Sequence, residues 1–172
     1  MLISPELENA INQQVGNEFG ASLQYVSIAG YFQRDDLEQL AAFFFRQADE
    51  ERMHAMKFAH YILDAGGQLR IPAIPAAPYD FKNAEEAIQA ALDWELTVTR
   101  QINALMEIAF QQKDYIGQNF LQWFVTEQLE EVSTMNTLLS ITRRAGANLL
   151  FVEEYLTRRP DPHTAAAGGE AA

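Results

Sequence analysis

Acidic, amide and imidazole side chains occur at helical spacing inside apolar stretches of this chain. Glu51 and His54 are three positions apart, so a helix places both on one face, and an amide–acid pair further along repeats that spacing. Two more apolar stretches each carry a single acid. The full set is Glu18, Glu51, His54, Glu95, Gln128 and Glu131. Because buried charges are costly unless they are paired or bind metal, this set predicts a shared cation. Its oxygen-rich donors with one imidazole suit iron or manganese better than copper.

Each of these side chains lies near the middle of an apolar seam that advances in steps of three and four residues. One such seam runs through Leu40, Phe44, Gln47, Glu51, His54 and Phe58. None of the 12 lysine and arginine residues lies in the four seams to neutralise the acids. A single acid in a helix is more often solvated, and a single histidine is more often a core residue, but the joint pattern favours a metal site.

Proline positions define the elements that must carry these seams. No proline interrupts residues 6–71 or 79–159, so long helices fit both spans. We expect long helices over residues 5–32, 36–65, 83–112 and 115–144, and a short apolar fifth helix over 147–157. The expected N-terminal caps are Ser4 for the first helix, Asp35 or Asp36 for the second, and Asn83 or Asp80 for the third.

The predicted connections are short, long and short. Short turns at 34–36 and 113–114 make the first two helices antiparallel and the last two antiparallel. Residues 68–81, at roughly 3.3 Å per residue, are long enough to cross the bundle. The predicted fold class is all-α, a four-helix bundle with one long crossover and a short fifth helix, over residues 1–157. We expect residues 158–172, rich in Pro, Ala and Gly, to form a disordered tail.

Composition excludes several classes of function. The 172 residues include no cysteine, which rules out disulfides, thiolate zinc sites and cysteine-ligated iron–sulfur clusters. The formal net charge of -12 should repel nucleic acid and attract cations. No signal-peptide pattern is visible, and no stretch approaches the roughly 18 apolar residues of a membrane span. We therefore expect a cytoplasmic protein without nucleic-acid or membrane partners.

The motifs around the acids resemble the ferroxidase centre of the ferritins, and in particular of prokaryotic non-haem ferritins. These motifs are Asn17-Glu18-Phe19 followed by Tyr25, Asp49-Glu50-Glu51-Arg52-Met53-His54, Trp94-Glu95, and Trp123-Phe124-Val125-Thr126-Glu127-Gln128-Leu129-Glu130-Glu131. The resemblance covers about residues 1–157 and implies a ferritin-like bundle. It also implies oxidation of Fe(II) by dioxygen or peroxide, and storage of ferric mineral in a homo-oligomeric shell of 24 subunits.

The resemblance also implies roles for individual residues. Glu18, Glu51 and His54 would hold one iron, with Glu51 bridging to a second. Glu95 would help to hold that second iron. Two further residues would lie close to the second iron, namely Gln128 and Glu131.

Further roles follow from the same resemblance. Tyr25 would hydrogen-bond near the di-iron centre and could supply an electron, and Trp123 matches an aromatic residue near the centre. A third iron site would lie beside the pair. Its matching residues are Glu50, Glu127, Glu130 and Glu131.

Two departures separate this chain from the bacterioferritins. Those proteins repeat the Glu-x-x-His motif on the fourth helix, whereas this chain has Glu131 in place of the second histidine. Their haem is held by a methionine directly after the second-helix ligand glutamate, and that position is Arg52 here. We therefore expect no haem.

Two other functions compete with iron storage. One is a rubrerythrin-like di-iron or di-manganese peroxidase on the same bundle, which the absence of cysteine and the single seam histidine argue against. The other is a structural bundle whose buried acids only set the helix register. A structural bundle would take up no metal and would become more stable if the acids were made apolar.

Overall fold

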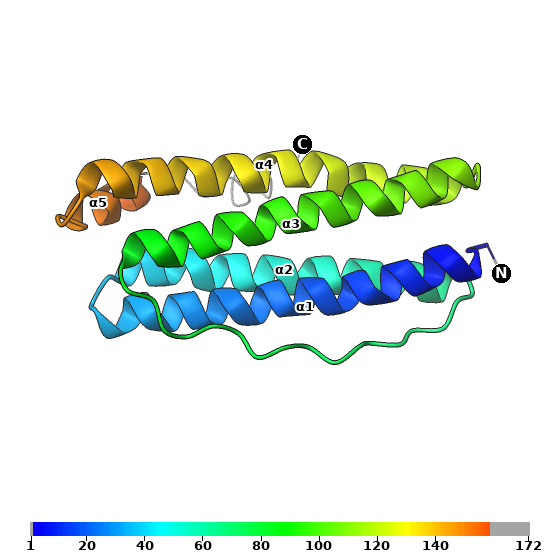
Figure 1. Cartoon of the computed structure of the whole chain (residues 1–172), viewed down its shortest axis with the longest axis horizontal. Helices are drawn as coiled ribbons and strands as arrows, with labels where there is room; N and C mark the ends of the chain where they lie inside the picture. The colour runs from blue at the N-terminus through cyan, green and yellow to red at the C-terminus, as the bar shows by residue number, and fades with distance from the viewer. Residues whose placement is uncertain (1, 159–172) are drawn as a thin grey trace, which may run out of the picture.

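Four long helices and one short helix make up the fold (Figure 1). The structure is a computed structural model that describes residues 2–158. Its elements are α1 (Pro5–Arg34), α2 (Glu38–Asp64), α3 (Ala84–Gln111), α4 (Tyr115–Ala145) and α5 (Leu150–Arg158). No strand occurs among residues 2–158, so the predicted all-α class is confirmed.

The helices form two antiparallel pairs, α1 with α2 and α3 with α4, and α3 also lies beside α1. The segment between α2 and α3 runs the length of the bundle in an extended form (Figure 1). This crossover returns the chain to the end of the bundle at which α2 began, so α2 and α3 run parallel. The predicted order of short, long and short connections is confirmed.

Contacts with α1 hold the crossover in place. The buried Asn12 amide donates to the Gln68 carbonyl at 3.0 Å and accepts from the Arg70 N–H at 2.5 Å. One turn further along α1, a Cβ atom on Gly16 would lie only 2.4 Å from Pro72 Cγ. Gly16 therefore allows the rigid proline ring to approach the helix closely, at the cost in helix propensity that glycine brings.

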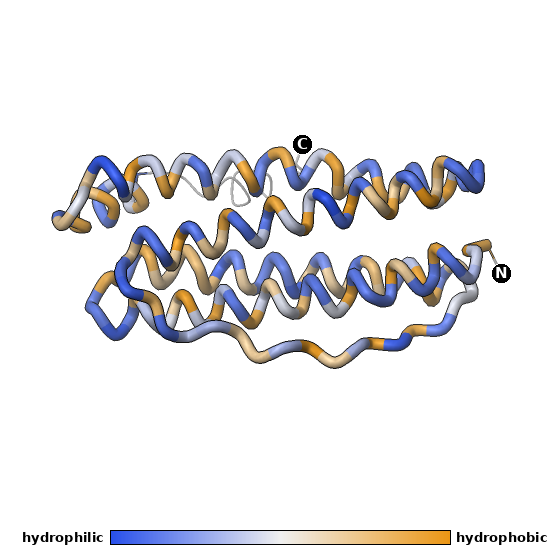
Figure 2. Tube along the Cα trace, viewed as in Figure 1, coloured by the Kyte–Doolittle hydropathy of each residue, from blue (hydrophilic) through white to orange (hydrophobic). Residues whose placement is uncertain are grey.

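The apolar core is divided into two clusters by a polar layer. One cluster includes Phe32 and Phe44, and the other includes Ile11 and Phe58. In each long helix, the residues of the two clusters lie on opposite sides of the mid-helix acids. Figure 2 shows hydrophobic positions recurring along the whole length of every helix. The layer between the clusters therefore has packed apolar surface both above and below it.

The start of α2 differs from the prediction that Asp35 or Asp36 would cap it. The N-cap position is Leu37, which has no capping side chain, and Asp36 has a positive φ of 58° in the turn. The Glu153 carboxylate of α5 takes over this role by accepting from the backbone N–H groups of Gln39 and Leu40, at 2.9 and 2.8 Å. The cap therefore comes from a residue distant in sequence.

Other boundaries agree with the expected ones to within a few residues. Ser4 and Asn83 cap α1 and α3 as predicted, each accepting from a first-turn N–H. The fifth helix, expected over residues 147–157, is α5 and runs to Arg158, the last described residue. The domain boundary at residue 157 stays a prediction. The rest of the expected disordered tail, residues 159–172, lies outside the described residues.

We predict that Glu153→Ala lowers the free energy of unfolding by about 1–2 kcal/mol, because it removes the acceptor of two helix N-terminal N–H groups. Guanidinium denaturation followed by circular dichroism measures this. The matched control is Glu154→Ala, which removes only an exposed pair with Arg158 and should cost well under 1 kcal/mol. Equal effects of the two substitutions would contradict the capping role.

Candidate metal centre

Polar side chains from all four long helices meet in the layer between the two apolar clusters. Glu18, Glu51 and Glu95 are at most 1% exposed. The buried polar residues of this layer are Glu18, Glu51, His54, Glu95, Gln128 and Glu131. No lysine or arginine of residues 2–158 is among the buried side chains. The acids are therefore concentrated in a layer that contains no buried permanent cation to balance them.

The acids and the histidine form two groups of potential metal ligands. In one group, ligand atoms of Glu18, Glu51 and His54 all lie within 4.8 Å of one another. In the other, the same holds for Glu51, Glu95 and Glu131. Glu51 belongs to both groups, so its carboxylate occupies the position that a bridging ligand between two ions would need.

Two carboxylate oxygens in this layer are buried without a hydrogen-bond partner among the described residues. These are Oε2 of Glu18 and Oε1 of Glu51. A buried acceptor that lacks a partner costs roughly 1–3 kcal/mol, and more if it is charged. A proton shared between Glu18 and Glu51 would join the two carboxyl groups by a hydrogen bond, and with both ionised their oxygens fit divalent metal ions.

Burial raises the pKa of every acid in the two groups. It raises the pKa of Glu18 from 4.5 to about 7. For Glu51 and Glu131, burial and then the charge of Glu95 raise the pKa well above the ordinary range. Burial also raises the pKa of Glu95, although hydrogen bonds from Tyr25 and Gln128 oppose the shift. Without metal, the layer therefore retains protons that water-exposed glutamates would release.

Neighbouring polar groups orient two of the acids. The Tyr25 hydroxyl donates to Oε1 of Glu95, and Gln128 Nε2 donates to Oε2 of Glu95 at 3.1 Å. Gln14 Nε2 donates to Oε1 of Glu18 at 2.8 Å. Gln14 was missed in the sequence, although its position four residues before Glu18 puts both on one helix face. In this structure, Gln128 presents its amide nitrogen to Glu95.

A third ligand group adjoins the first. Ligand atoms of Glu50, His54 and Glu127 lie within 4.8 Å of one another, so His54 is shared as well. Gln47 Nε2 donates to Glu50 Oε2 at 2.6 Å. Glu130, which the resemblance places in a third site, is exposed and lies outside the three ligand groups found among the described residues.

Aromatic rings surround the His54 side of the layer. The His54 ring meets Trp123 edge-on, with centroids 5.4 Å apart, and meets Phe124 at 5.9 Å. Trp123 therefore lies beside the ligand groups, in the place that the resemblance implies. Of the other two histidines, His60 is exposed, and His163 lies outside the described residues.

A buried carboxylate layer that shares one glutamate between two ligand groups is typical of dinuclear metal proteins built on four-helix bundles. The long connection between α2 and α3 excludes the up-and-down four-helix bundles, in which all loops are short, and leaves the bundles with one long crossover. Among residues 2–158, no helix is long and apolar enough to span a membrane.

Comparison with known proteins identifies the family. A family model described as a ferritin-like domain matches residues 8–145. Ferritin BfrB of Mycobacterium tuberculosis is 44% identical over 158 residues, which cover 92% of this chain and 87% of that protein. A bacterial non-heme ferritin of Staphylococcus aureus is 37% identical, over 89% of this chain and 93% of that protein. A solved open pore ferritin from Archaeoglobus fulgidus has a TM-score of 0.88 at 32% identity, over 92% of this chain and 99% of that one.

The chain belongs to the ferritin family. The resemblance to prokaryotic ferritins is therefore confirmed, and family and fold together support iron storage as its function. The rubrerythrin-like alternative is not favoured.

We predict that the metal-free protein loses stability as the pH rises from about 4.5 to about 7, because the Glu18 carboxyl has a higher pKa folded than unfolded. The stabilising effect of its proton is complete below the lower value and lost above the higher one, on the order of 3 kcal/mol in all. Calorimetric melting at a series of pH values measures the loss.

The variant Glu18→Gln should flatten the part of this pH dependence that Glu18 causes, and Zn²⁺ should restore the stability of the unsubstituted protein at pH 7. A melting temperature of the metal-free protein that is unchanged or rises over this pH range would contradict the assignment.

Proposed function

We propose that this chain is a ferroxidase that oxidises Fe(II) at an intrasubunit di-iron centre and stores the Fe(III) product. The main observation behind this proposal is that Glu51 belongs to two buried ligand groups and carries an oxygen without a partner. In the proposed centre, Glu18, Glu51 and His54 bind the first ferrous ion. Glu95 and Glu131 bind the second, and Glu51 bridges the two.

Iron binding and proton release are coupled in this mechanism. Because the acids hold protons in the metal-free state, the incoming ferrous ions displace them. Carboxylates stabilise ferric ions more than ferrous ions, since the ferric charge is higher. The centre therefore favours oxidation in addition to binding.

The oxidation step balances with dioxygen as the oxidant. Two ferrous ions each give one electron to dioxygen. With four water molecules, the reaction yields two ferric oxyhydroxide units, one hydrogen peroxide and four protons. Both electrons of this step come from the two ferrous ions, and the buried Tyr25 hydroxyl orients Glu95 by a hydrogen bond. This hydroxyl keeps its proton at neutral pH, because burial and the nearby acids raise its pKa well above the ordinary value.

The group of Glu50, His54 and Glu127 is the proposed third iron site. It shares His54 with the first iron, which provides a short route for an ion that leaves the centre. Glu127 is only partly buried, so this group is more open than the other two. In this proposal, exposed Glu130 acts further out, as a carboxylate that guides ferric product towards the mineral.

Storage requires a container, and a single bundle cannot enclose one. We therefore propose a homo-oligomeric shell, with 24 subunits as the number that the family resemblance implies. Several large apolar side chains are exposed on the single chain, which is consistent with burial between subunits. They include Leu23, Val26, Phe45 and Tyr79, which are between 42% and 83% exposed.

We predict that Glu51→Ala lowers the initial rate of Fe(II) oxidation at least about a hundredfold, because it removes the ligand shared by both ions. Ferric absorbance is followed after anaerobic loading with Fe(II) and exposure to air. The matched control is Glu107→Ala, an exposed acid on α3, which should oxidise iron at the original rate.

Size-exclusion chromatography of the same samples separates storage from a rubrerythrin-like enzyme. A particle many times the 19.4 kDa chain supports a shell, whereas a dimer would favour the enzyme. Oxidation by Glu51→Ala at the unsubstituted rate would overturn the di-iron assignment whatever the particle size.

We further propose that Gln128 keeps the second iron labile. The substitution Gln128→Glu puts a negative oxygen beside Glu95, so we predict that the second iron binds about tenfold tighter and that repeated turnover slows. Successive small additions of Fe(II) measure this, since the first addition should oxidise normally and later ones slowly. Gln122→Glu, on the exposed surface of α4, is the control. Equal rates for all additions would contradict this role.

A further inference from the structure

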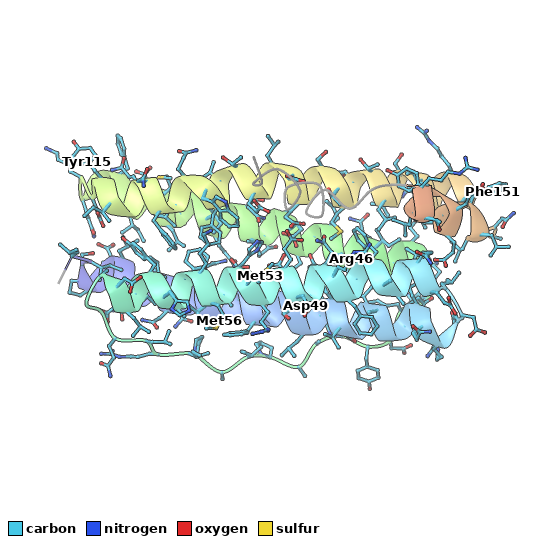
Figure 3. The ribbon with its side chains drawn as sticks, turned by 180° about the vertical axis from the view of Figure 1, so that it is seen from behind. Arg46, Asp49, Met53, Met56, Tyr115 and Phe151 are labelled. Atoms are coloured by element: carbon cyan, nitrogen blue, oxygen red, sulfur yellow. The ribbon has the colours of Figure 1, made fainter. Side chains whose placement is uncertain are left out.

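Lys57 lies against the tryptophan that borders the candidate centre. Its Nζ atom is 3.7 Å from the centroid of the Trp123 ring, within the range of a cation–π contact. Lys57 follows His54 by one helical turn on α2, and Trp123 is on α4, so the contact joins two helices. Met53, which is labelled on α2 in Figure 3, lies four residues before Lys57 and so on about the same side of the helix, and it is 63% exposed.

Trp123 is the less firmly held of the two rings that contact His54. Phe124 is 2% exposed and stacks on Phe58 with centroids 3.9 Å apart, so the core fixes it. Trp123 is 39% exposed, and its contact with the core is edge-on to Phe124, with centroids 4.8 Å apart, so packing fixes it less completely. Its indole nevertheless meets the His54 ring edge-on, at an interplanar angle of 75°. The ammonium group of Lys57 is therefore a contact that can set the position of this indole.

The helices α2 and α4 contact each other through long side chains, because their backbones do not approach closely. No Cα atom of α2 lies within 8 Å of one in α4 among the described residues. Phe58 with Phe124, and Lys57 with Trp123, are among the contacts that cross this distance. Within α2, the Nδ1 atom of His54 lies 3.3 Å from Oε2 of Glu51, and across the gap between the helices the Trp123 and Phe124 rings contact the imidazole. The orientation of His54 therefore depends on Glu51 together with these two rings of α4.

The orientation of His54 matters because two ligand groups share it. Its ring takes part in the group with Glu18 and Glu51 and in the group with Glu50 and Glu127. A single imidazole orientation determines how its nitrogens are divided between the two groups. A contact that fixes the ring therefore affects how metal is distributed between the centre and the neighbouring third group.

We infer that Lys57 is a positioning residue for the metal centre: its ammonium holds the Trp123 indole against His54 and so fixes the imidazole for metal binding. This inference rests on the proposed function for its consequence, but the contact itself exists without metal. Lys57 acts through Trp123 and is not itself a ligand. Arginine, which also stacks on aromatic rings, should replace it, whereas glutamine should not.

The experiment uses the full chain with Trp94→Phe, which leaves Trp123 as the sole tryptophan of the two in the sequence. Lys57→Gln and Lys57→Arg are compared, with Lys82→Gln as a control for loss of an exposed lysine charge. First, acrylamide quenching of tryptophan fluorescence is measured in the metal-free proteins. Second, Co²⁺ is titrated in the absence of oxygen, and its visible absorption bands report the ligands around the ion.

We expect Lys57→Gln to raise the quenching constant of Trp123 about two- to fivefold, the population change expected from losing one exposed cation–π contact. We also expect Lys57→Gln to shift the Co²⁺ absorption bands and weaken Co²⁺ binding. For Lys57→Arg and Lys82→Gln, the quenching constant, the Co²⁺ bands and the Co²⁺ affinity should all stay close to those of the parent protein. The melting temperature should change little, which separates positioning from loss of the fold.

Two results would overturn the inference. If the acrylamide quenching constant of Trp123 is the same in Lys57→Gln as in the parent protein, the lysine does not hold the indole. Changed quenching with unchanged Co²⁺ bands would mean that the indole does not position His54. The proposed function fails separately, if Glu51→Ala leaves Co²⁺ binding and Fe(II) oxidation intact.

Discussion

The cost of burying several carboxylates together is the constraint on which this structure depends. Four glutamates from four helices lie in one layer, and each is at most 3% exposed. Burial raises the pKa of all four, and the charges of neighbouring acids raise it further for Glu18, Glu51 and Glu131. Two of their oxygens lack hydrogen-bond partners among the described residues. A protein interior holds such a group only if protons or metal ions balance the charge. In the proposed function, incoming ferrous ions displace the protons of this layer, so metal takes over the balancing of the charge.

Burial of apolar side chains in the rest of the bundle offsets the free-energy cost of burying the acids in this layer. Separate apolar clusters pack above and below it, so the buried acids are enclosed between two packed regions. Tyr25 and Gln14 hold individual carboxylates in place by hydrogen bonds. The crossover, seated on α1 through Asn12 and Gly16, makes the parallel placement of α2 and α3 possible. Each of these features serves to bring four mid-helix acids to one height.

The periodicity of the sequence was sufficient to predict the helices, their order and the residues that converge on the layer. Apolar residues spaced three and four apart define the one side of each helix that faces the core. Glu18, Glu51 and Glu95 lie on that side, so they were expected to point into the core. The cap of α2 could not be predicted, because Glu153 is more than a hundred residues away in sequence. The pairing of Gly16 with Pro72 depends on the path of an extended segment, for which periodicity gives no signal. The partner of each carboxylate also depends on rotamers, which is why the sequence pattern gave no role to Gln14.

The contact between Glu153 and the start of α2 has a consequence for biosynthesis. The first turn of α2 emerges from the ribosome long before α5 is made, and until then two of its N–H groups lack the carboxylate that later accepts them. The α1–α2 hairpin is therefore completed only when the last helix of the subunit docks. A nascent or truncated chain without α5 lacks the carboxylate acceptor for these two N–H groups, so the first turn of α2 is held less firmly there than in the finished chain.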